Sequence, residues 1–252
     1  MHANARWSLR SWLLDCVSLR AAAALLVCAW TSPSAGQLSG TLSAVSDYRY
    51  RGFTLSDRMP AAQAGVAYDN PRGWYAGAFG STVRLKPPRG SSSYVQSIVY
   101  AGYAARLSPG FSVEAGGDYS AFAGASDLDY GEVFVGASTA DLNARIYYSP
   151  RYFGGPSGGL YGEIGALQPL VERVRLDLHV GFLRYRYESA YVVLPAWEST
   201  QHAIDGRVGL RIELDPFELA IAWVGVSNHT AGYLISGSRS PNTAVATLSL
   251  AF

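Results

Sequence analysis

The sequence predicts an all-β protein, a transmembrane antiparallel up-and-down β-barrel of about 12 strands. Three observations lead to this fold class. The composition pairs 27 Gly and 17 Tyr with only 15% charged residues among 252, a mixture that favours strands and tight turns over helices. Apolar and polar residues alternate along most of the chain with a period of two. The connections between the alternating segments are short and long in turn, as in membrane barrels.

The alternation is clearest near position 210. Val208, Leu210 and Ile212 are each followed by a glycine or a charged residue, so one face of this strand is apolar and the other is polar. This pattern alone suits a soluble sandwich as well as a membrane barrel. The segment lengths favour the barrel, because a tilted membrane strand needs about 9 to 11 residues. The predicted strands span residues 38–51, 61–69, 74–84, 94–107, 111–122, 128–139, 142–153, 160–168, 173–187, 200–214, 217–229 and 242–252.

The connections between these segments indicate how the barrel is oriented. Tight turns rich in Pro, Gly, Asn and Asp are expected at 70–73, 108–110, 140–141, 169–172 and 215–216. Longer connections are expected at about 52–60, 85–93, 123–127, 154–159, 188–199 and 230–241. Because short and long connections alternate, the turns should lie at one end of the barrel, together with both termini, and the loops at the other.

Residues 1–36 are predicted to be a secretory signal peptide that is removed, which leaves the barrel at residues 37–252. Three arginines precede an apolar stretch at 21–30, and small and helix-breaking residues follow at 31–36. The last residues of the chain alternate and finish on Phe252. This ending resembles the assembly signal of bacterial outer-membrane proteins and implies outer-membrane lipid and the barrel assembly machinery as partners.

Several classes of protein are excluded. A net charge of +1 argues against nucleic-acid binding, and no apolar run reaches the roughly 20 residues of a membrane helix. Cys16 and Cys28 both fall in the leader, so no disulfide, thiol catalyst or Cys metal site is expected. His179, His202 and His229 lie on separate predicted strands at different heights, which argues against a metal site or a hydrolase dyad. No enzyme and no cofactor are expected.

Aromatic residues near the predicted strand ends are expected to form the two interfacial girdles of a membrane barrel. At the turn end these are Tyr68, Trp74 and Phe111, and at the loop end Tyr48, Tyr50, Phe53, Tyr147, Tyr148, Tyr152, Tyr185 and Tyr187.

Charged residues in the polar phase of the strands are expected to face the lumen, because a charge at mid-depth on the lipid face costs about 2 to 4 kcal/mol. They could line an aqueous constriction or pair across the interior and plug it. The predicted lumen residues are Asp47, Arg49, Glu114, Asp118, Glu132, Arg145, Glu163, Arg175, Asp177, His179, Asp205, Arg207, Arg211 and Glu213.

Several motifs also resemble a known family. The segment VSDYRYRGF at 45–53, GWYAG at 73–77, ARIYYSPRYFG at 144–154 and LYGE at 160–163 are similar to the TorF-type putative porins. The resemblance covers about residues 40–185 and implies one outer-membrane barrel of porin type, with no catalytic residues to transfer. Arg151 and the basic stretch at 85–90 depart from the family, where acidic character is usual. Charge selectivity assumed for the family is therefore not carried over.

Two functions follow as expectations. The first is a porin-like outer-membrane channel for passive diffusion of small hydrophilic solutes. The alternative is a closed outer-membrane barrel with a structural or surface-recognition role through its extracellular loops. The connections at 188–199 and 230–241 carry no adhesive repeat, which favours the channel.

Overall fold

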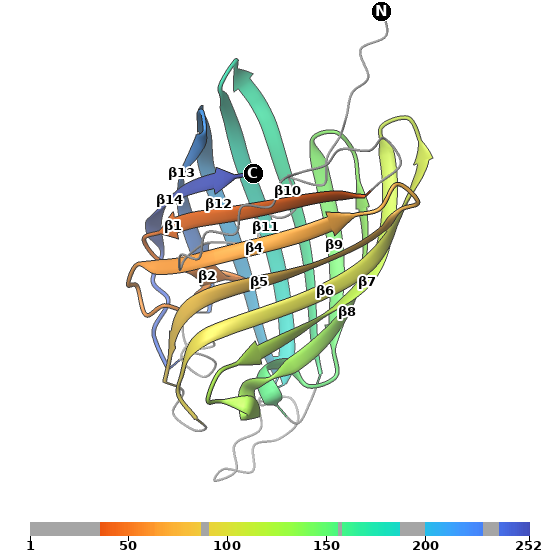
Figure 1. Ribbon diagram of the computed structural model, residues 1–252. Helices are drawn as coiled ribbons and strands as arrows, with labels where there is room; N and C mark the ends of the chain where they lie inside the picture. The colour runs from red at the N-terminus through yellow and green to blue at the C-terminus, as the bar shows by residue number, and fades with distance from the viewer. Residues whose placement is uncertain (1–35, 87–90, 156–157, 187–199, 229–236) are drawn as a thin grey trace, which may run out of the picture.

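Twelve strands close into a single antiparallel barrel in which each strand pairs with its neighbours along the chain (Figure 1). The computed structural model describes residues 36–86, 91–155, 158–186, 200–228 and 237–252. The predicted signal peptide therefore lies outside the described residues, apart from Gly36. The predicted fold class is confirmed, and the strand number with it. Within the described ranges, no helix is long and apolar enough to cross a membrane.

The barrel strands follow the predicted order closely. Their bounds are β1 Gln37–Val45, β4 Ala61–Asp69, β5 Trp74–Leu85, β6 Ser93–Ser108, β7 Phe111–Phe122, β8 Tyr130–Ser138, β9 Leu142–Ser149, β10 Gly159–Val171, β11 Val174–Arg186, β12 Thr200–Leu214, β13 Phe217–Val226 and β14 Thr243–Ala251. Strand β10 continues past Pro169 through an irregularity of register, so the prediction that it ends before this proline is wrong.

The ring is closed where β1 pairs with β14, from Thr41 opposite Ala251 to Val45 opposite Thr247. Tight turns join β4 to β5, β6 to β7, β8 to β9, β10 to β11 and β12 to β13, all at the upper end in Figure 1. We call this the turn end and the opposite end the loop end. Short 3-10 helices, η1 Ser126–Leu128 and η2 Tyr152–Gly154, lie at the loop end.

The outer face of the barrel is apolar. Val133, Val208 and Ile221, on three different strands, each expose half or more of their surface. In water such a face would be costly, at about 25 cal/mol for each Å² of apolar surface, whereas lipid matches it. On β12, Asp205 and Arg211 are buried on the opposite face. The apolar residues of the predicted alternation therefore face outward, as a transmembrane barrel requires.

The aromatic girdles differ from those predicted. At the turn end Tyr68, Trp74 and Phe111 are exposed as expected, and the Trp74 ring meets that of Tyr103 edge-on at 5.0 Å. At the loop end the prediction is mostly wrong, because only Tyr148 is exposed to the outside, accompanied by Tyr94 and Tyr119. The side chains that face inward or lie in loops are buried, namely Tyr48, Phe53, Tyr147, Tyr152 and Tyr185. Tyr50 is half-buried, and Tyr187 lies outside the described residues.

The first strand is shorter than predicted. Strand β1 ends at Val45 instead of at residue 51, and β4 begins at Ala61. The residues between them form a separate two-stranded sheet, β2 Arg49–Tyr50 and β3 Phe53–Thr54. Most of this segment is buried, because it folds into the barrel instead of continuing the wall. We call residues 46–60 the luminal hairpin.

Candidate functional site

The luminal hairpin is built around a two-residue turn. Arg51 and Gly52 both have positive φ, 51° and 78°, as in the turns that match the twist of a tight β-hairpin. Glycine adopts this backbone freely, but at an arginine it costs on the order of 1 kcal/mol. Interactions of the Arg51 side chain must therefore hold this conformation.

The base of the hairpin is fixed by one carboxylate. Asp47 accepts hydrogen bonds from Thr54 Oγ1 at 2.6 Å and from Ser56 Oγ at 3.3 Å. Arg49 pairs with the same carboxylate at 2.6 Å. The prediction placed Asp47 and Arg49 on the first barrel strand, and this is wrong. The alternation continues into the hairpin, so the sequence pattern does not mark the point at which the chain leaves the wall.

The hairpin tip reaches across the lumen to the far walls. Arg51 donates two hydrogen bonds to Glu132 on β8, at 3.0 and 2.5 Å, and both side chains are at most 5% exposed. Gly52 lies so close to β12 and β13 that a methyl group in its place would come within 2.6 Å of Asp205 and 2.9 Å of Val226. The hairpin is therefore clamped between opposite sides of the barrel.

Four tyrosine rings surround the Arg51 guanidinium. Their centroids lie 4.3 to 5.2 Å from its central carbon, and the residues are Tyr50, Tyr147, Tyr152 and Tyr161. Each such cation–π contact contributes about 0.5 to 2 kcal/mol, most when water is excluded. Together with Glu132 they compensate the cost of burying the arginine charge and of its left-handed backbone.

The loop-end half of the interior is filled with apolar side chains. The Phe153 ring of η2 lies 4.9 Å from the Tyr130 ring and 5.5 Å from the Phe122 ring. Leu55 of the hairpin packs there with no exposed surface. Burial raises the pKa of the Tyr152 phenol above its ordinary value, so this group stays neutral in the cluster. This half of the barrel is packed like a protein core.

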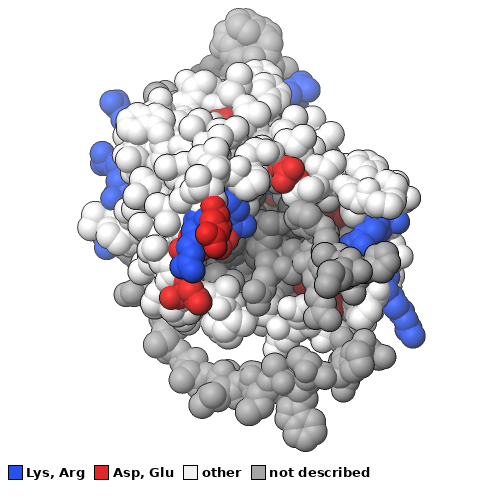
Figure 2. All heavy atoms as spheres, turned by 90° about the horizontal axis from the view of Figure 1, so that it is seen from above, with Lys and Arg blue, Asp and Glu red and all other residues white. Residues whose placement is uncertain are grey.

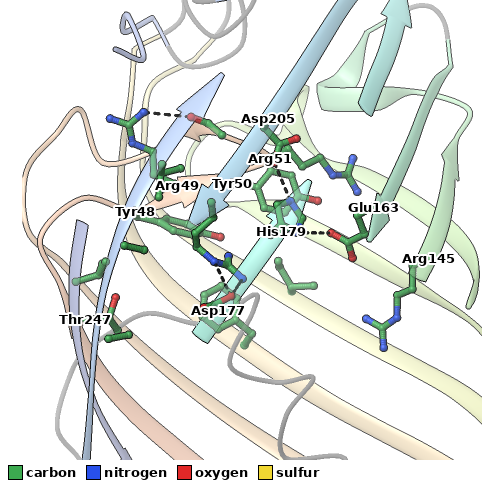
Figure 3. A pocket seen from close by; sticks show the side chains of 18 of the residues that line it. Tyr48, Arg49, Tyr50, Arg51, Arg145, Glu163, Asp177, His179, Asp205 and Thr247 are labelled. Carbon is green, nitrogen blue, oxygen red and sulfur yellow. Dashed lines mark hydrogen bonds and ion pairs between the residues drawn. The ribbon is translucent and has the colours of Figure 1, made fainter. Parts of the chain in front are cut away.

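The turn-end half holds a cavity of about 230 Å³. Figure 2, seen from the turn end, shows a hollow with acidic and basic side chains on its wall. The hairpin residues Asp47 and Arg49 form part of its lining, and Figure 3 shows Asp177, His179 and Asp205 facing it from the wall. The described part of the barrel is thus open at the turn end and packed at the loop end.

One side of this cavity carries a ladder of paired charges on β11, β12 and β13. The Asp177 carboxylate forms ion pairs with Arg207, at 3.1 Å, and with Arg211, at 2.9 Å. Arg211 also meets Glu218 at 3.3 Å, and Arg175 lies 3.0 Å from the same carboxylate. Glu213, paired with Arg175 at 2.9 Å, is the outermost member, with half of its side chain exposed. Every arginine of this ladder has a carboxylate beside it.

His179 belongs to a second network on β10, β11 and β12. Its Nε2 atom lies 2.8 Å from Asp205 Oδ1 and 3.2 Å from the Tyr161 hydroxyl, and its Nδ1 atom lies 4.0 Å from Glu163. Figure 3 shows both carboxylates directed at the imidazole. His202 lies exposed on the adjoining strand, and His229 is outside the described residues. Among the described residues, no three His, Cys, Asp or Glu side chains are grouped as a metal site requires.

The remaining wall, on β5 to β9, is rich in aromatic rings. Glu114 is held by Arg145 at 2.5 Å and accepts a hydrogen bond from the Tyr75 hydroxyl at 2.7 Å. Asp118 also lines the cavity, and within the described parts of the chain no hydrogen bond or ion pair engages its carboxylate. The two sides of the cavity therefore differ in how fully their charges are neutralised.

The structure places the predicted lumen residues in three groups. Asp47 and Arg49 belong to the hairpin. Glu114, Asp118, Glu132 and Arg145 lie on the inner face of β7 to β9, and Glu163, Arg175, Asp177, His179, Asp205, Arg207, Arg211 and Glu213 lie on that of β10 to β12, Glu213 at the rim. Glu114, Glu132, Arg175 and Glu213 are outside the cavity lining itself.

The predicted list of lumen residues omits three charged residues of the interior. Arg51, Asp69 and Glu218 all line the cavity. Glu218 lies between Phe217 and Leu219 on β13, so the period-two pattern could have identified it. The Arg51-Gly52 pair could have been recognised as a turn, because glycine favours positive φ.

Comparisons with known proteins give the following matches. No curated protein matches the sequence. Among solved structures, a NanC porin is 14% identical, with a TM-score of 0.49 and coverage of 86% of this chain and 99% of that chain. A KdgM porin is 12% identical, with a TM-score of 0.47 and coverage of 85% and 98%. LpxR from Salmonella typhimurium is 10% identical, with a TM-score of 0.38 and coverage of 85% and 99%. A family model described as "Bacterial protein of unknown function (Gcw_chp)" matches residues 29–252.

Proposed function

This chain belongs to the Gcw_chp family of bacterial proteins of unknown function, and we propose that it is a porin-like channel of the outer membrane, narrowed by its luminal hairpin. Small hydrophilic solutes would diffuse through it passively. The observation that carries this proposal is a charged, open cavity inside a barrel whose outer face is apolar. A barrel that served only as a membrane anchor would have no need of so many ionised groups in its interior.

The size of the barrel supports this proposal. Barrels of about 8 strands are filled by their own side chains, and those of 16 or more enclose an aqueous channel. Twelve strands leave room for an extra segment inside the lumen, and here the luminal hairpin occupies it. The hairpin sets the narrowest point of the proposed path, because Arg51 and Gly52 contact opposite walls.

The proposed path is lined by charges of both signs. From the turn end it would pass the Arg211 and Asp177 ladder, then Arg207, and then reach Asp47 and Arg49 of the hairpin. Fixed charges in a narrow, low-dielectric passage act strongly on passing ions. These residues are proposed to set ion selectivity.

The remaining features of this proposal concern export. Residues 1–36 would act as a secretory signal peptide, and Phe252 would be read by the barrel assembly machinery. The resemblance of several motifs to the TorF-type putative porins agrees with this proposed location, although the family model that matches is Gcw_chp. Recovery of the protein from the soluble periplasm, or from the cytosol with the leader intact, would contradict this part.

Conductance in planar bilayers tests the channel directly. We expect a small conductance for the wild type and a several-fold larger one when residues 47–58 are replaced by a short Gly-Ser linker. Strands β1 and β4 pair along their whole lengths without the hairpin, so the wall should remain closed in this variant. Heat-modifiable gel migration provides the control for a folded barrel. A folded variant that conducts no better than the wild type would contradict the role of the hairpin.

A closed barrel with a structural or surface-recognition role is the second candidate. The apolar packing of the loop-end half favours it, since Leu55, Phe122 and Phe153 are all buried in one hydrophobic cluster. In this case the wild type would conduct nothing, and binding would involve the loops. A complete absence of wild-type conductance in repeated reconstitutions would favour this candidate over the channel.

A further inference from the structure

We propose that the turn-end cavity binds small organic cations with an aromatic or aliphatic body, and that Asp118 supplies the opposing charge. The inference deepens the proposed function, on which it rests for the solute's path, by naming the class of solute. It starts from the difference between the two sides of the cavity. One side consists of paired charges, whereas the other combines aromatic rings with Asp118, whose carboxylate forms no ion pair with an arginine in the described part of the chain.

Asp118 occupies the centre of the aromatic side. On β7 it lies opposite Tyr100 of β6 and opposite Glu132 of β8. Residues opposite each other on one face of a sheet have Cβ atoms about 5 Å apart. Glu132 is already engaged by Arg51, and in the described part of the chain Asp118 takes part in no hydrogen bond or ion pair. A bound cation would supply the contact that this carboxylate lacks.

The arginines that line the described part of the cavity form their ion pairs with carboxylates other than Asp118. Arg145 is held by Glu114 and Arg51 by Glu132, and both of these carboxylates lie outside the lining. The acidic residues that line the cavity are Asp47, Asp69, Asp118, Glu163, Asp177, Asp205 and Glu218, and the basic ones are Arg49, Arg51, Arg145, Arg207, Arg211 and His179. The excess is acidic, which favours cations over anions in the cavity.

Aromatic residues lie on both strands beside Asp118, with Tyr100 directly opposite on β6 and Phe134 two residues beyond the opposite position on β8. The Tyr100 ring lies 6.5 Å from that of Tyr75. Phe134 is paired with Gly116, where a methyl group would come within 2.6 Å of the ring tip, so this glycine leaves the Phe134 ring its space on the wall. Faces of aromatic rings attract ammonium groups. The Arg145 guanidinium already lies 5.1 Å from the centre of the Phe134 ring. An incoming ammonium ion would therefore meet the rings of Tyr75 and Tyr100, which also line the cavity, together with the Asp118 carboxylate.

The entrance and the size of the cavity agree with such a ligand. Asp69, at the turn end of β4, lines the same cavity and, within the described ranges, has no ion-pair partner either. A cation entering from the turn end would thus meet Asp69 before Asp118. The volume of about 230 Å³ is below the roughly 300 to 1,000 Å³ of pockets for drug-sized ligands, which favours a small amine.

Binding to the purified, refolded barrel tests this inference without requiring conduction. The probes are benzylammonium, benzyl alcohol and benzoate, which share a ring and differ in charge, measured by isothermal titration calorimetry in micelles. We expect benzylammonium to bind at least about tenfold more tightly than benzyl alcohol, as a charge-assisted contact predicts, and benzoate to bind least. In Asp118→Asn the preference for benzylammonium over benzyl alcohol should disappear. Glu213→Gln, which removes an exposed carboxylate at the rim, is the matched control and should retain it.

The outcomes separate this site from the channel. Equal binding of the three probes, or an unchanged preference in a folded Asp118→Asn barrel, overturns the cation site even if the protein conducts. If the barrel binds the cation but conducts nothing, the result supports the binding site and contradicts the proposed channel. If Asp118→Asn does not fold, Tyr100→Leu provides the second test, because loss of the ring should weaken benzylammonium more than methylammonium. Equal weakening of both would contradict the aromatic contribution.

Discussion

The two halves of the barrel interior use the same ion-pair chemistry in opposite surroundings. At the loop end, the side chains of Arg51 and Glu132 are 5% and 1% exposed and lie among aromatic rings. At the turn end, Arg207 and Asp177 are 21% and 8% exposed, and Arg175 with Glu213 is still more open. The comparison shows that the surroundings, and not the residue types, decide whether such a pair locks the structure or presents charge to solvent.

The physical reason is the dielectric environment. Two unit charges about 4 Å apart interact by about 1 kcal/mol in water and by about 4 kcal/mol at an effective dielectric constant of 20. A buried charge also loses its hydration, so its partner becomes indispensable. The hairpin is therefore held by a contact that is costly to break, whereas the more exposed turn-end pairs, such as that of Arg207 with Asp177, can be removed with less effect.

The largest effect is expected for Arg51→Ala, which leaves Glu132 buried without its arginine. We expect the free energy of unfolding to fall by about 3 to 5 kcal/mol, together with a rise in single-channel conductance as the hairpin loosens. Urea titration in micelles and planar-bilayer recordings measure the two effects. The double variant Arg51→Ala with Glu132→Ala is the control and should recover part of the stability. A decrease of less than about 1 kcal/mol in the free energy of unfolding of Arg51→Ala would show that water reaches Glu132 in the loop-end half.

A smaller effect is expected on the outer face at the turn-end half. Leu210 is 40% exposed there, and Leu210→Arg should place a charge in lipid at a cost of about 2 to 4 kcal/mol. The fraction of heat-modifiable, folded barrel should decrease, while Leu210→Ile should assemble normally. Equal assembly of both variants would contradict the assignment of this face to lipid.

Arg211→Leu, at the residue next to Leu210, is also expected to destabilise the barrel, but for a different reason. The alternation alone suggests that Arg211→Leu is harmless, since this residue faces inward. The structure instead pairs Arg211 with Asp177 and Glu218, so Arg211→Leu should destabilise the wall as well and is unsuitable as a control.

The smallest effect is expected for Arg207→Gln. Asp177 keeps Arg211 as a partner, and water screens the remaining charge, so the free energy of unfolding should change by about 1 kcal/mol or less. The reversal potential in a salt gradient should nevertheless shift toward the value of a cation-selective pore, because the substitution removes one positive charge from the cavity. If stability fell as far as in Arg51→Ala, the two halves would not differ in solvent access.

The sequence could predict the wall because lipid imposes a strict rule on it. Every second residue of a strand such as β12 must be apolar, and turns such as 215–216 need particular residues. These local constraints give the strand order, the two ends and the inward side of residues such as Asp177 and Asp205.

The hairpin could not be predicted by the same rule. Asp47, Arg49 and Arg51 continue the polar phase of β1, so the alternation gives no sign that the wall ends at Val45. Tyrosines at strand ends such as Tyr147 suit an interface as well as an interior. Their burial depends on Arg51, which comes from a distant part of the sequence. Long-range contacts of this kind are absent from any local pattern.

The place at which the hairpin leaves the wall has a consequence for how such barrels diverge. Val45 and Ala61, the residues before and after it, are paired with each other in the β1–β4 ladder. The segment between them can therefore be lengthened, shortened or exchanged without breaking the β1–β4 ladder, at a cost in loop entropy that grows slowly with length. The hairpin's own contacts with the wall, such as those of Ser46 with Ala246 of β14 and of Leu55 with Arg84 of β5, would be lost. The luminal hairpin and the barrel strands lie in separate stretches of the chain. Evolution or an engineer can therefore exchange the hairpin while the strands of the wall are retained.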